Sequence, residues 1–437
     1  MKVCLVSPLR EGVPAARTGT FPAPPLSLAV VAALTPPGTE VSIIDEHVEP
    51  IDLDASADLV GITATTQTVT RAYKIADAFR ARGVKVVLGG IHPSVLPEEA
   101  AQHADAVVVG EAEETWPQLV ADFKAGRMRS LYRADRHPSL AGLPVPRREL
   151  FGRGRYLIPD TVYTTRGCPY GCAFCSVTSF FGGSYRWRPV NEVVKEIEGV
   201  PDRRLILFVD DNVVGHRGYS RELFRALMPL KLRWIGQASM TIARDEALLA
   251  EAAASGCLGL FLGIESISPA NLESVGKRQN VVEEYEAAIH RIHSHGISVL
   301  GSFIFGFDHD TEEVFEATVR FAQRARLESA QFAILTPYPG TATFSSLDRE
   351  GRLLTKDWSQ YREDRVVFEP RLMSRERLLE GWNWAWKEFY SLGSIWSRVG
   401  LSHPWLPMVW AVNLNYRNDR LSRALFDRLA GWISSWR

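Results

Sequence analysis

Apolar and polar residues alternate in blocks along the first 125 residues. Short runs rich in Val, Ile and Leu are separated by segments whose apolar residues recur every three to four positions, as in helices. The runs are "KVCLVSP" (2–8), "EVSIIDE" (40–46), "ADLVGITAT" (57–65), "VKVVLGG" (84–90) and "ADAVVVGE" (104–111). Continuous apolar strands joined by helices are typical of buried parallel sheets. The pattern therefore predicts a five-stranded, doubly wound parallel sheet over residues 1–126.

The same alternation returns after an interruption. Residues 127–160 are rich in Arg, Pro and Gly and show little periodicity, so we interpret them as a connector between domains. From 161 to 345 six apolar runs alternate with helical patterns, which predicts a partial (β/α)6 barrel, since a complete barrel has eight such units. The expected fold class is α/β, with a helical region over 346–437.

Tryptophan is concentrated near the C-terminus. Eight of the twelve lie in the last 56 residues: Trp382, Trp384, Trp386, Trp396, Trp405, Trp410, Trp432 and Trp436. Trp382, Trp386 and Tyr390 recur every four positions, which places them on one face of a helix. We expect a helical cap packed on the barrel. A large apolar substrate pocket and contact with a membrane surface are the alternatives.

Composition narrows the possible functions. The net charge is −1, from 50 basic and 51 acidic residues, which gives no basic surface of the kind that binds nucleic acid. No run of about 18 apolar residues is present, and the N-terminus is too short for a signal peptide. We therefore expect a cytoplasmic protein.

Three of the five cysteines lie in "RGCPYGCAFC" (166–175), with the spacing C-x3-C-x2-C. Three thiolates on one loop can bind three irons of a [4Fe–4S] cluster and leave the fourth iron open, whereas electron-transfer clusters generally use four cysteines. A zinc site needs four ligands, and a redox pair of Cys172 and Cys175 leaves Cys168 without a role. Cys4 and Cys257 are expected to be buried small residues.

This loop, with Phe174 before the last cysteine, resembles the radical S-adenosylmethionine (radical SAM) superfamily. "FVDDN" (208–212), "GIES" (263–266), "GKRQN" (276–280) and "TPYPGT" (336–341) resemble the subgroup that carries an N-terminal cobalamin-binding domain. The resemblance implies a [4Fe–4S] cluster on Cys168, Cys172 and Cys175, S-adenosylmethionine on the open iron, and cobalamin on the N-terminal sheet.

The resemblance also implies site residues at the strand ends. Candidates for contact with the cluster or S-adenosylmethionine are Phe174, Gln237, Ser239, Glu265, Arg278 and Gly306. Candidates for contact with cobalamin are Thr65, Thr66, Gly89, Gly90, His92, Gly110 and Glu111. Candidate catalytic residues are Tyr338, Asp210 and Asp211. For Glu265 the alternative is a salt bridge with Lys277 or Arg278. For Tyr338 it is packing, and one of the two aspartates is expected to cap the next helix.

One feature of histidine-ligated cobalamin domains is missing. Methionine synthase-like domains have an Asp-x-His-x-x-Gly motif after the first strand, whereas here the first strand leads into "SPLREG". Asp45 and His47 follow the second strand, and Pro50 stands where the glycine is needed. We therefore expect cobalamin to bind without a histidine ligand.

The expected activity is C-methylation of an unactivated carbon in a small molecule, such as a natural product, lipid or tetrapyrrole-like compound. Cyclisation, ring contraction or oxidative rearrangement with the same cofactors is the nearest alternative. A non-catalytic cluster or cobalamin sensor is a more distant one. The resemblance implies an external electron donor such as a flavodoxin or ferredoxin, while the cofactors supply the chemistry and the protein supplies orientation and protection from oxygen.

Overall fold

A computed structural model describes residues 1–12, 23–152, 155–201, 205–401, 403 and 405–418. Its N-terminal sheet has six parallel strands in the order β2-β1-β3-β4-β5-β6. They are β1 (Lys2–Ser7), β2 (Glu40–Asp45), β3 (Leu59–Thr63), β4 (Lys85–Gly89), β5 (Ala106–Val109) and β6 (Leu131–Arg133). The five expected strands are confirmed. The sixth corrects the prediction, because it lies in the supposed connector and three residues are too few to show a pattern.

Helices cover both faces of this sheet, as expected for a doubly wound fold. Leu5 of β1 packs in one core with α1 (Leu26–Leu34) and α5 (Thr115–Lys124). Cys4 and Val6, its neighbours in the strand, pack on the other face with α2 (Val69–Ala81). The strand order reverses between β1 and β3, and ligands of such sheets bind outside the carboxyl ends of the strands at this point.

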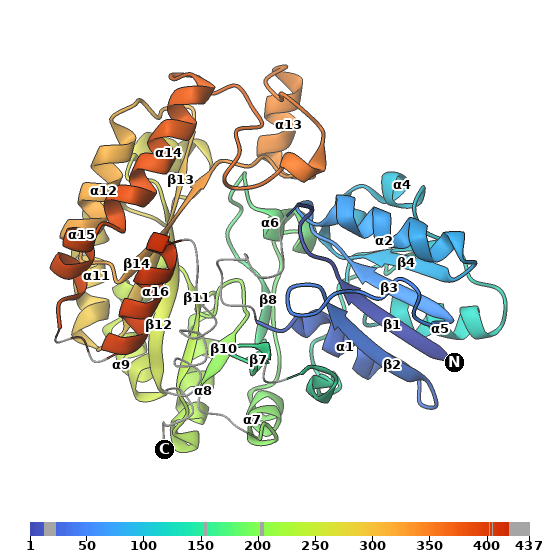
Figure 1. The fold of residues 1–437 in the computed structure, drawn as a ribbon. Helices are drawn as coiled ribbons and strands as arrows, with labels where there is room; N and C mark the ends of the chain where they lie inside the picture. Colours follow the sequence, from blue (N-terminus) through green and yellow to red (C-terminus); the bar gives the residue numbers. More distant parts are fainter. Residues whose placement is uncertain (13–22, 153–154, 202–204, 402, 404, 419–437) are drawn as a thin grey trace.

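The second sheet is the predicted six-stranded partial barrel. All its strands are parallel, and their order is β14-β13-β12-β11-β10-β7. They are β7 (Thr161–Val162), β10 (Ile206–Phe208), β11 (Trp234–Ala238), β12 (Cys257–Glu265), β13 (Ser298–Phe305) and β14 (Ser329–Ile334). Helices α7 (Val190–Glu198), α8 (Arg217–Leu227), α9 (Glu246–Ala254), α11 (Tyr285–Ser294) and α12 (Val314–Arg324) follow the strands (Figure 1).

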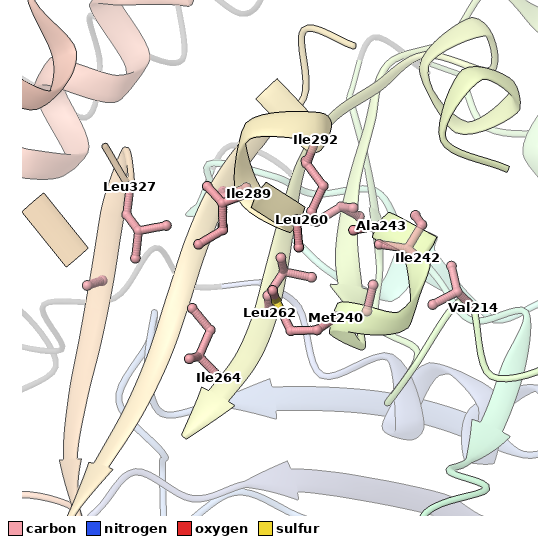
Figure 2. Packing of buried hydrophobic residues seen from close by; sticks show 14 of the residues in the cluster. Val214, Met240, Ile242, Ala243, Leu260, Leu262, Ile264, Ile289, Ile292 and Leu327 are labelled. Atoms are coloured by element: carbon pink, nitrogen blue, oxygen red, sulfur yellow. The ribbon is translucent and has the colours of Figure 1, made fainter. Parts of the chain in front are cut away.

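Alternate residues of the barrel strands face the helices. Figure 2 shows Leu260, Leu262 and Ile264 of β12 beside Ile289 and Ile292 of α11. All five side chains are buried, whereas the intervening positions of β12 are half-buried. The intervening residues therefore lie on the inner face of the open barrel.

The C-terminal region forms a helical cap on the barrel, as predicted. It contains α14 (Arg375–Phe389), α15 (Leu392–Val399) and α16 (Leu406–Asn418). The indole nitrogens of Trp382 and Trp386 both donate to the carbonyl of Phe332 in β14, at 2.8 and 3.0 Å. Tyr390, one turn further on, hydrogen bonds both backbone groups of Ala330. Trp432 and Trp436 lie outside the described residues.

The segment between the barrel and this cap departs from the expectation of a wholly helical region. After α13 (Ala342–Arg349), residues 350–370 return to the N-terminal domain, where Trp358, Tyr361 and Val367 join the core beneath α2. The Trp358 indole donates to the carboxylate of Glu99 at 3.0 Å. This segment therefore joins the two α/β domains.

Candidate active site

The three clustered cysteines lie between the two α/β domains. Strand β8 (Thr165–Gly167) pairs antiparallel with β9 (Tyr185–Trp187), and the cysteine loop leads from β8 into α6 (Ser176–Phe181) (Figure 1). Gly167 has φ +83°, and a Cβ there would collide with the carbonyl of Ser184. Cys175 begins α6, and its N–H donates to the Cys172 carbonyl at 3.0 Å. The loop is thus held at both ends.

Amide and ammonium groups surround the thiols. Asn212 Nδ2 lies 3.8 Å from Cys168 Sγ, and Gln279 Nε2 lies 3.8 Å from Cys172 Sγ. Burial raises the pKa of the Cys168 thiol, while Asn212 and Lys277 act in the opposite direction. Among the described residues, no three His, Cys, Asp or Glu side chains converge as ligands of a single ion do. Three thiols that bind separate irons of one cluster need no such convergence.

Glu265, at the end of β12, is paired with Lys277. Its Oε1 lies 2.8 Å from Lys277 Nζ, and both side chains are largely buried. Burial alone would lower the pKa of Lys277, but Glu265 and the neighbouring thiols raise it. Arg278, which the sequence proposed for this place, is instead exposed beside Glu273 and Glu283.

The structure therefore adds Asn212, Lys277 and Gln279 to the surroundings of the thiols. All three belong to the "FVDDN" and "GKRQN" motifs, so the signal was present in the sequence. Sequence alone does not tell which side chains of a short loop point to the ligand.

The other barrel candidates have different surroundings. Gln237 is exposed in the open barrel, and the Ser239 N–H donates to Asn212 Oδ1 at 3.1 Å. Phe174 packs against Phe307, with ring centroids 6.0 Å apart. Gly306 has φ +99°, and a Cβ there would lie 3.0 Å from side-chain atoms of Leu378 and Phe368, so packing against the C-terminal region already requires glycine.

The two aspartates that follow β10 differ in their burial and in their hydrogen bonds. Asp210 is fully buried and accepts hydrogen bonds from the backbone and hydroxyl groups of Thr164 and Thr165. Asp211 accepts one from the Gly167 N–H at 2.9 Å and lines a cavity. Burial raises the Asp211 pKa to about 6, with a further contribution from Asp210. Neither caps α8, whose N-cap is His216.

The cavity that Asp211 lines has a volume of about 310 Å³ and extends between the domains. Its walls in the N-terminal domain come from the sheet face, α1 and α5, and from the barrel domain they include Phe180 and Phe181 of α6. Gly61 and Gly89 contribute backbone without a side chain, and no described residue that lines the cavity is a histidine.

The cobalamin candidates fall into two groups. Gly89, Gly90, Gly110 and Glu111 line the cavity. Thr66 and His92 are buried apart from it, with His92 hydrogen bonded to Thr66 at 3.0 Å and to Glu99 at 3.3 Å. Thr65 is exposed and bonded to Thr68.

Tyr338 lies at a contact between the domains. Its hydroxyl donates to Glu363 Oε1 at 2.9 Å and accepts from Gln67 of the N-terminal domain at 2.5 Å. Burial raises the pKa of Tyr338 well above its usual value. These contacts support the packing alternative for this residue.

Comparison with known proteins agrees with this division of the chain. The model of the radical SAM superfamily matches residues 162–322, and the model of the B12 binding domain matches residues 12–120. Bacteriochlorophyllide d C-12(1)-methyltransferase of Chlorobaculum tepidum is 33% identical over 414 residues, which cover 92% of this chain and 89% of the relative. The bacteriochlorophyllide d C-8(2)-methyltransferase of the same organism is 31% identical over 388 residues, which cover 83% of this chain and 86% of the relative.

A solved structure shows the same fold. The radical S-adenosylmethionine methyltransferase TsrM of Kitasatospora setae, with cobalamin and a [4Fe–4S] cluster bound, superimposes with a TM-score of 0.70 at 17% identity. The match covers 99% of this chain and 100% of TsrM. Together, the cysteine loop, the cavity between the domains and these matches show that the chain belongs to the cobalamin-dependent radical SAM family, and that it is a methyltransferase.

Proposed function

We propose that this enzyme methylates a carbon of a small, largely apolar molecule between its two α/β domains. The observation that carries the proposal is the cavity of about 310 Å³, the proposed seat of cobalamin, which begins at the N-terminal sheet and reaches the strand that leads into the cysteine loop. The two relatives from Chlorobaculum tepidum are named for bacteriochlorophyllide d, so a tetrapyrrole with an alkyl side chain is the first substrate to test.

The residues present suit the three cofactors of the family. Cys168, Cys172 and Cys175 would hold the cluster. Cobalamin would lie in the cavity, where Gly89 and Gly90 allow a close approach to the backbone. No described lining residue is a histidine, which supports cobalamin binding without such a ligand. When bound, these groups supply reductive cleavage of S-adenosylmethionine to a 5′-deoxyadenosyl radical and methyl transfer through cobalt.

The side chains of the protein would position the cofactors and shield the cavity from water. Gln237, in the open barrel, and the Glu265–Lys277 pair beside the thiols would bind the polar end of S-adenosylmethionine. Phe180 and Phe181 line the cavity on the barrel side, where their apolar rings would exclude water. Asp211, with its pKa of about 6, can hold or release a proton at the boundary of the cavity near neutral pH.

An external one-electron donor such as a flavodoxin or ferredoxin belongs to the proposal, because cleavage of S-adenosylmethionine is reductive. Pro169 and Gly171 of the cysteine loop are exposed, which supports direct access of a reduced protein to the cluster.

Anaerobic reconstitution with iron, sulfide and hydroxocobalamin tests the two cofactor sites separately. Wild-type protein should retain about four irons and one corrin per chain. Cys172→Ala should lose iron, whereas Cys257→Ala, which changes a buried cysteine of β12, should not. Retention of a full cluster by Cys172→Ala would contradict the assignment.

The cobalamin site is tested with a substitution that fills the cavity. Gly89 lines it, and a Cβ there meets only ordinary contacts, with Val108 Cβ at 3.7 Å. Gly89→Leu should therefore lose corrin and keep iron, whereas Gly393→Leu, at an exposed position of α15, should keep both. Unchanged corrin in Gly89→Leu would exclude this cavity as the seat. Loaded wild-type protein should then give S-adenosylhomocysteine together with a methylated tetrapyrrole.

A further inference from the structure

Arg166 connects the cysteine loop to the other domain. It lies in β8, two residues before Cys168, and its side chain extends to the loop after β5. Its NH1 lies 2.6 Å from Glu111 Oε1, and its NH2 lies 2.6 Å from Glu113 Oε1. The guanidinium also lies over the Tyr163 ring, 4.6 Å from the centroid. One planar cation thus holds two carboxylates of the cobalamin-binding domain.

Glu111 is shared by two arginines and a histidine. Its Oε2 lies 2.7 Å from Arg186 NH2, in β9, and 2.9 Å from His137 Nδ1. The Glu111 side chain is 3% exposed, so it depends on these partners. A buried ion pair that loses one partner leaves an uncompensated charge, which is strongly unfavourable. The carboxylate therefore fixes the relative position of β8, β9 and the end of β5.

Both ends of this network adjoin proposed cofactor seats. Gly110 precedes Glu111, lines the cavity, and donates its N–H to Ser94 Oγ at 2.9 Å. At the other end, Gly167 follows Arg166, donates to Asp211 and leads into Cys168. Arg166, Glu111 and Glu113 themselves line the cavity. The network thus forms part of the wall of the proposed cobalamin seat and is joined to the first cluster ligand through Gly167.

We propose that Arg166 is a positioning residue that sets the separation between the cobalamin seat and the cluster loop. The inference rests on the proposed function where it names the two cofactors. Arginine suits this role because its rigid fork binds two carboxylates in fixed directions, which the single ammonium of lysine does not do. A variable separation would let radical formation proceed without a methyl group within reach of the substrate.

Hydrogen exchange tests the proposal in the protein as purified, without added cofactors. The amides of Thr165 and Gly167 are held by Asp210 and Asp211, so their exchange reports loosening of β8. In Arg166→Gln, exchange of these two amides should rise roughly a hundredfold, since one partner of a buried ion network is lost. Amides of β1 and β12 should keep their rates.

The matched control is Arg225→Gln, which removes an exposed arginine paired with Glu251 at 2.6 Å inside the barrel domain. It should leave the β8 amides unchanged. Glu113→Gln removes one of the two carboxylate contacts of Arg166 from the opposite domain, so it replaces Arg166→Gln, with a smaller expected rise, if that variant does not fold. Equal acceleration throughout the chain, or none at β8, would overturn the proposal.

The separation itself can be measured in the loaded enzyme. Cob(II)alamin and the reduced cluster are both paramagnetic, so pulsed electron paramagnetic resonance gives their distance distribution. Arg166→Gln should broaden the distribution while iron and corrin contents stay at the wild-type level, and Arg166→Lys should give an intermediate width. An unchanged distribution would overturn the positioning role. Failure of the wild type to retain corrin would count against the proposed function. The role of Arg166 would then be decided by the hydrogen-exchange experiment, which needs no cofactor.

Discussion

Asp210 and Asp211 are adjacent in the sequence, yet the structure gives them different environments. Asp210 binds the backbone where β7 leads into β8, whereas Asp211 has one backbone hydrogen bond and faces the cavity. Burial and the neighbouring carboxylate both raise the pKa of Asp211 to about 6. The protonated form of Asp211 is therefore favoured in the folded protein relative to the unfolded chain.

The raised pKa of Asp211 predicts a pH-dependent change in stability. Its contribution is fully present below about pH 4, the pKa in the unfolded chain, and is lost as the pH rises through about 6. At pH 8, Asp211→Asn should thus be more stable than the wild type by about 2 kcal/mol in urea unfolding of the cofactor-free protein. The difference should shrink towards pH 5.

Asp245 serves as a control because its pKa is shifted in the opposite direction from that of Asp211. It caps α9 and lies near Arg217 and Arg221; although burial acts to raise its pKa, these contacts lower it. Asp245→Asn should be less stable than the wild type at pH 8. A stability difference for Asp211→Asn that is independent of pH would contradict the assigned pKa.

At the scale of elements, the free edge of β14 is covered by aromatic side chains from α14. A strand at the edge of a sheet exposes unpaired N–H and C=O groups, which invite association with other chains. Trp382 and Trp386 satisfy the carbonyl of Phe332, and Tyr390 satisfies both groups of Ala330. Trp382, Trp386 and Tyr390 are four residues apart, so the helix period brings all three side chains to the same side, along the edge of β14.

Removal of the Tyr390 hydroxyl tests whether these contacts at the edge of β14 stabilise the fold. Tyr390→Phe keeps the ring but leaves the N–H and C=O of Ala330 buried without partners. The free energy of unfolding should fall by about 2 kcal/mol, since unsatisfied buried groups cost about 1–3 kcal/mol. Trp384→Phe, on the exposed side of α14, should change it by less than about 0.5 kcal/mol. Equal effects of the two substitutions would show that the edge contacts do not stabilise the fold.

At the scale of the whole molecule, the chain returns to its first domain after completing the second. Trp358 is buried in the N-terminal core, and its ring centroid lies 5.3 Å from that of His92. Its indole shares Glu99 with His92 and with the Tyr73 hydroxyl. The N-terminal domain is thus completed by residues that lie far away in the sequence, since Glu99 and Trp358 are 259 positions apart.

This arrangement predicts that a substitution in the return segment weakens the first domain. Trp358→Ala should cost about 3–5 kcal/mol, the usual range for removing a buried tryptophan. The loss should show as faster hydrogen exchange in α2, with β12 unaffected. Trp396→Ala, which removes an exposed tryptophan of α15, should change neither. Loss of protection in β12 to the same extent would mean that the two domains unfold as one unit.

The sequence by itself determined the two α/β domains and predicted the three thiols that would hold the cluster. Long apolar runs and helix periods are local signals, so five of the six first-domain strands and all six barrel strands were predictable. The cysteine spacing is local as well, because one short loop carries all three thiols. The helical face of Trp382, Trp386 and Tyr390 was predictable for the same reason.

Only the tertiary structure decided which strand-end residues meet. Arg278 and Lys277 are adjacent, but only Lys277 lies beside Glu265 and the thiols. The ion network of Arg166 joins side chains 55 positions apart, and β6 forms only because β5 offers it an edge. Side-chain direction in loops and contacts between distant segments depend on how the domains pack, and no local pattern of residues encodes them.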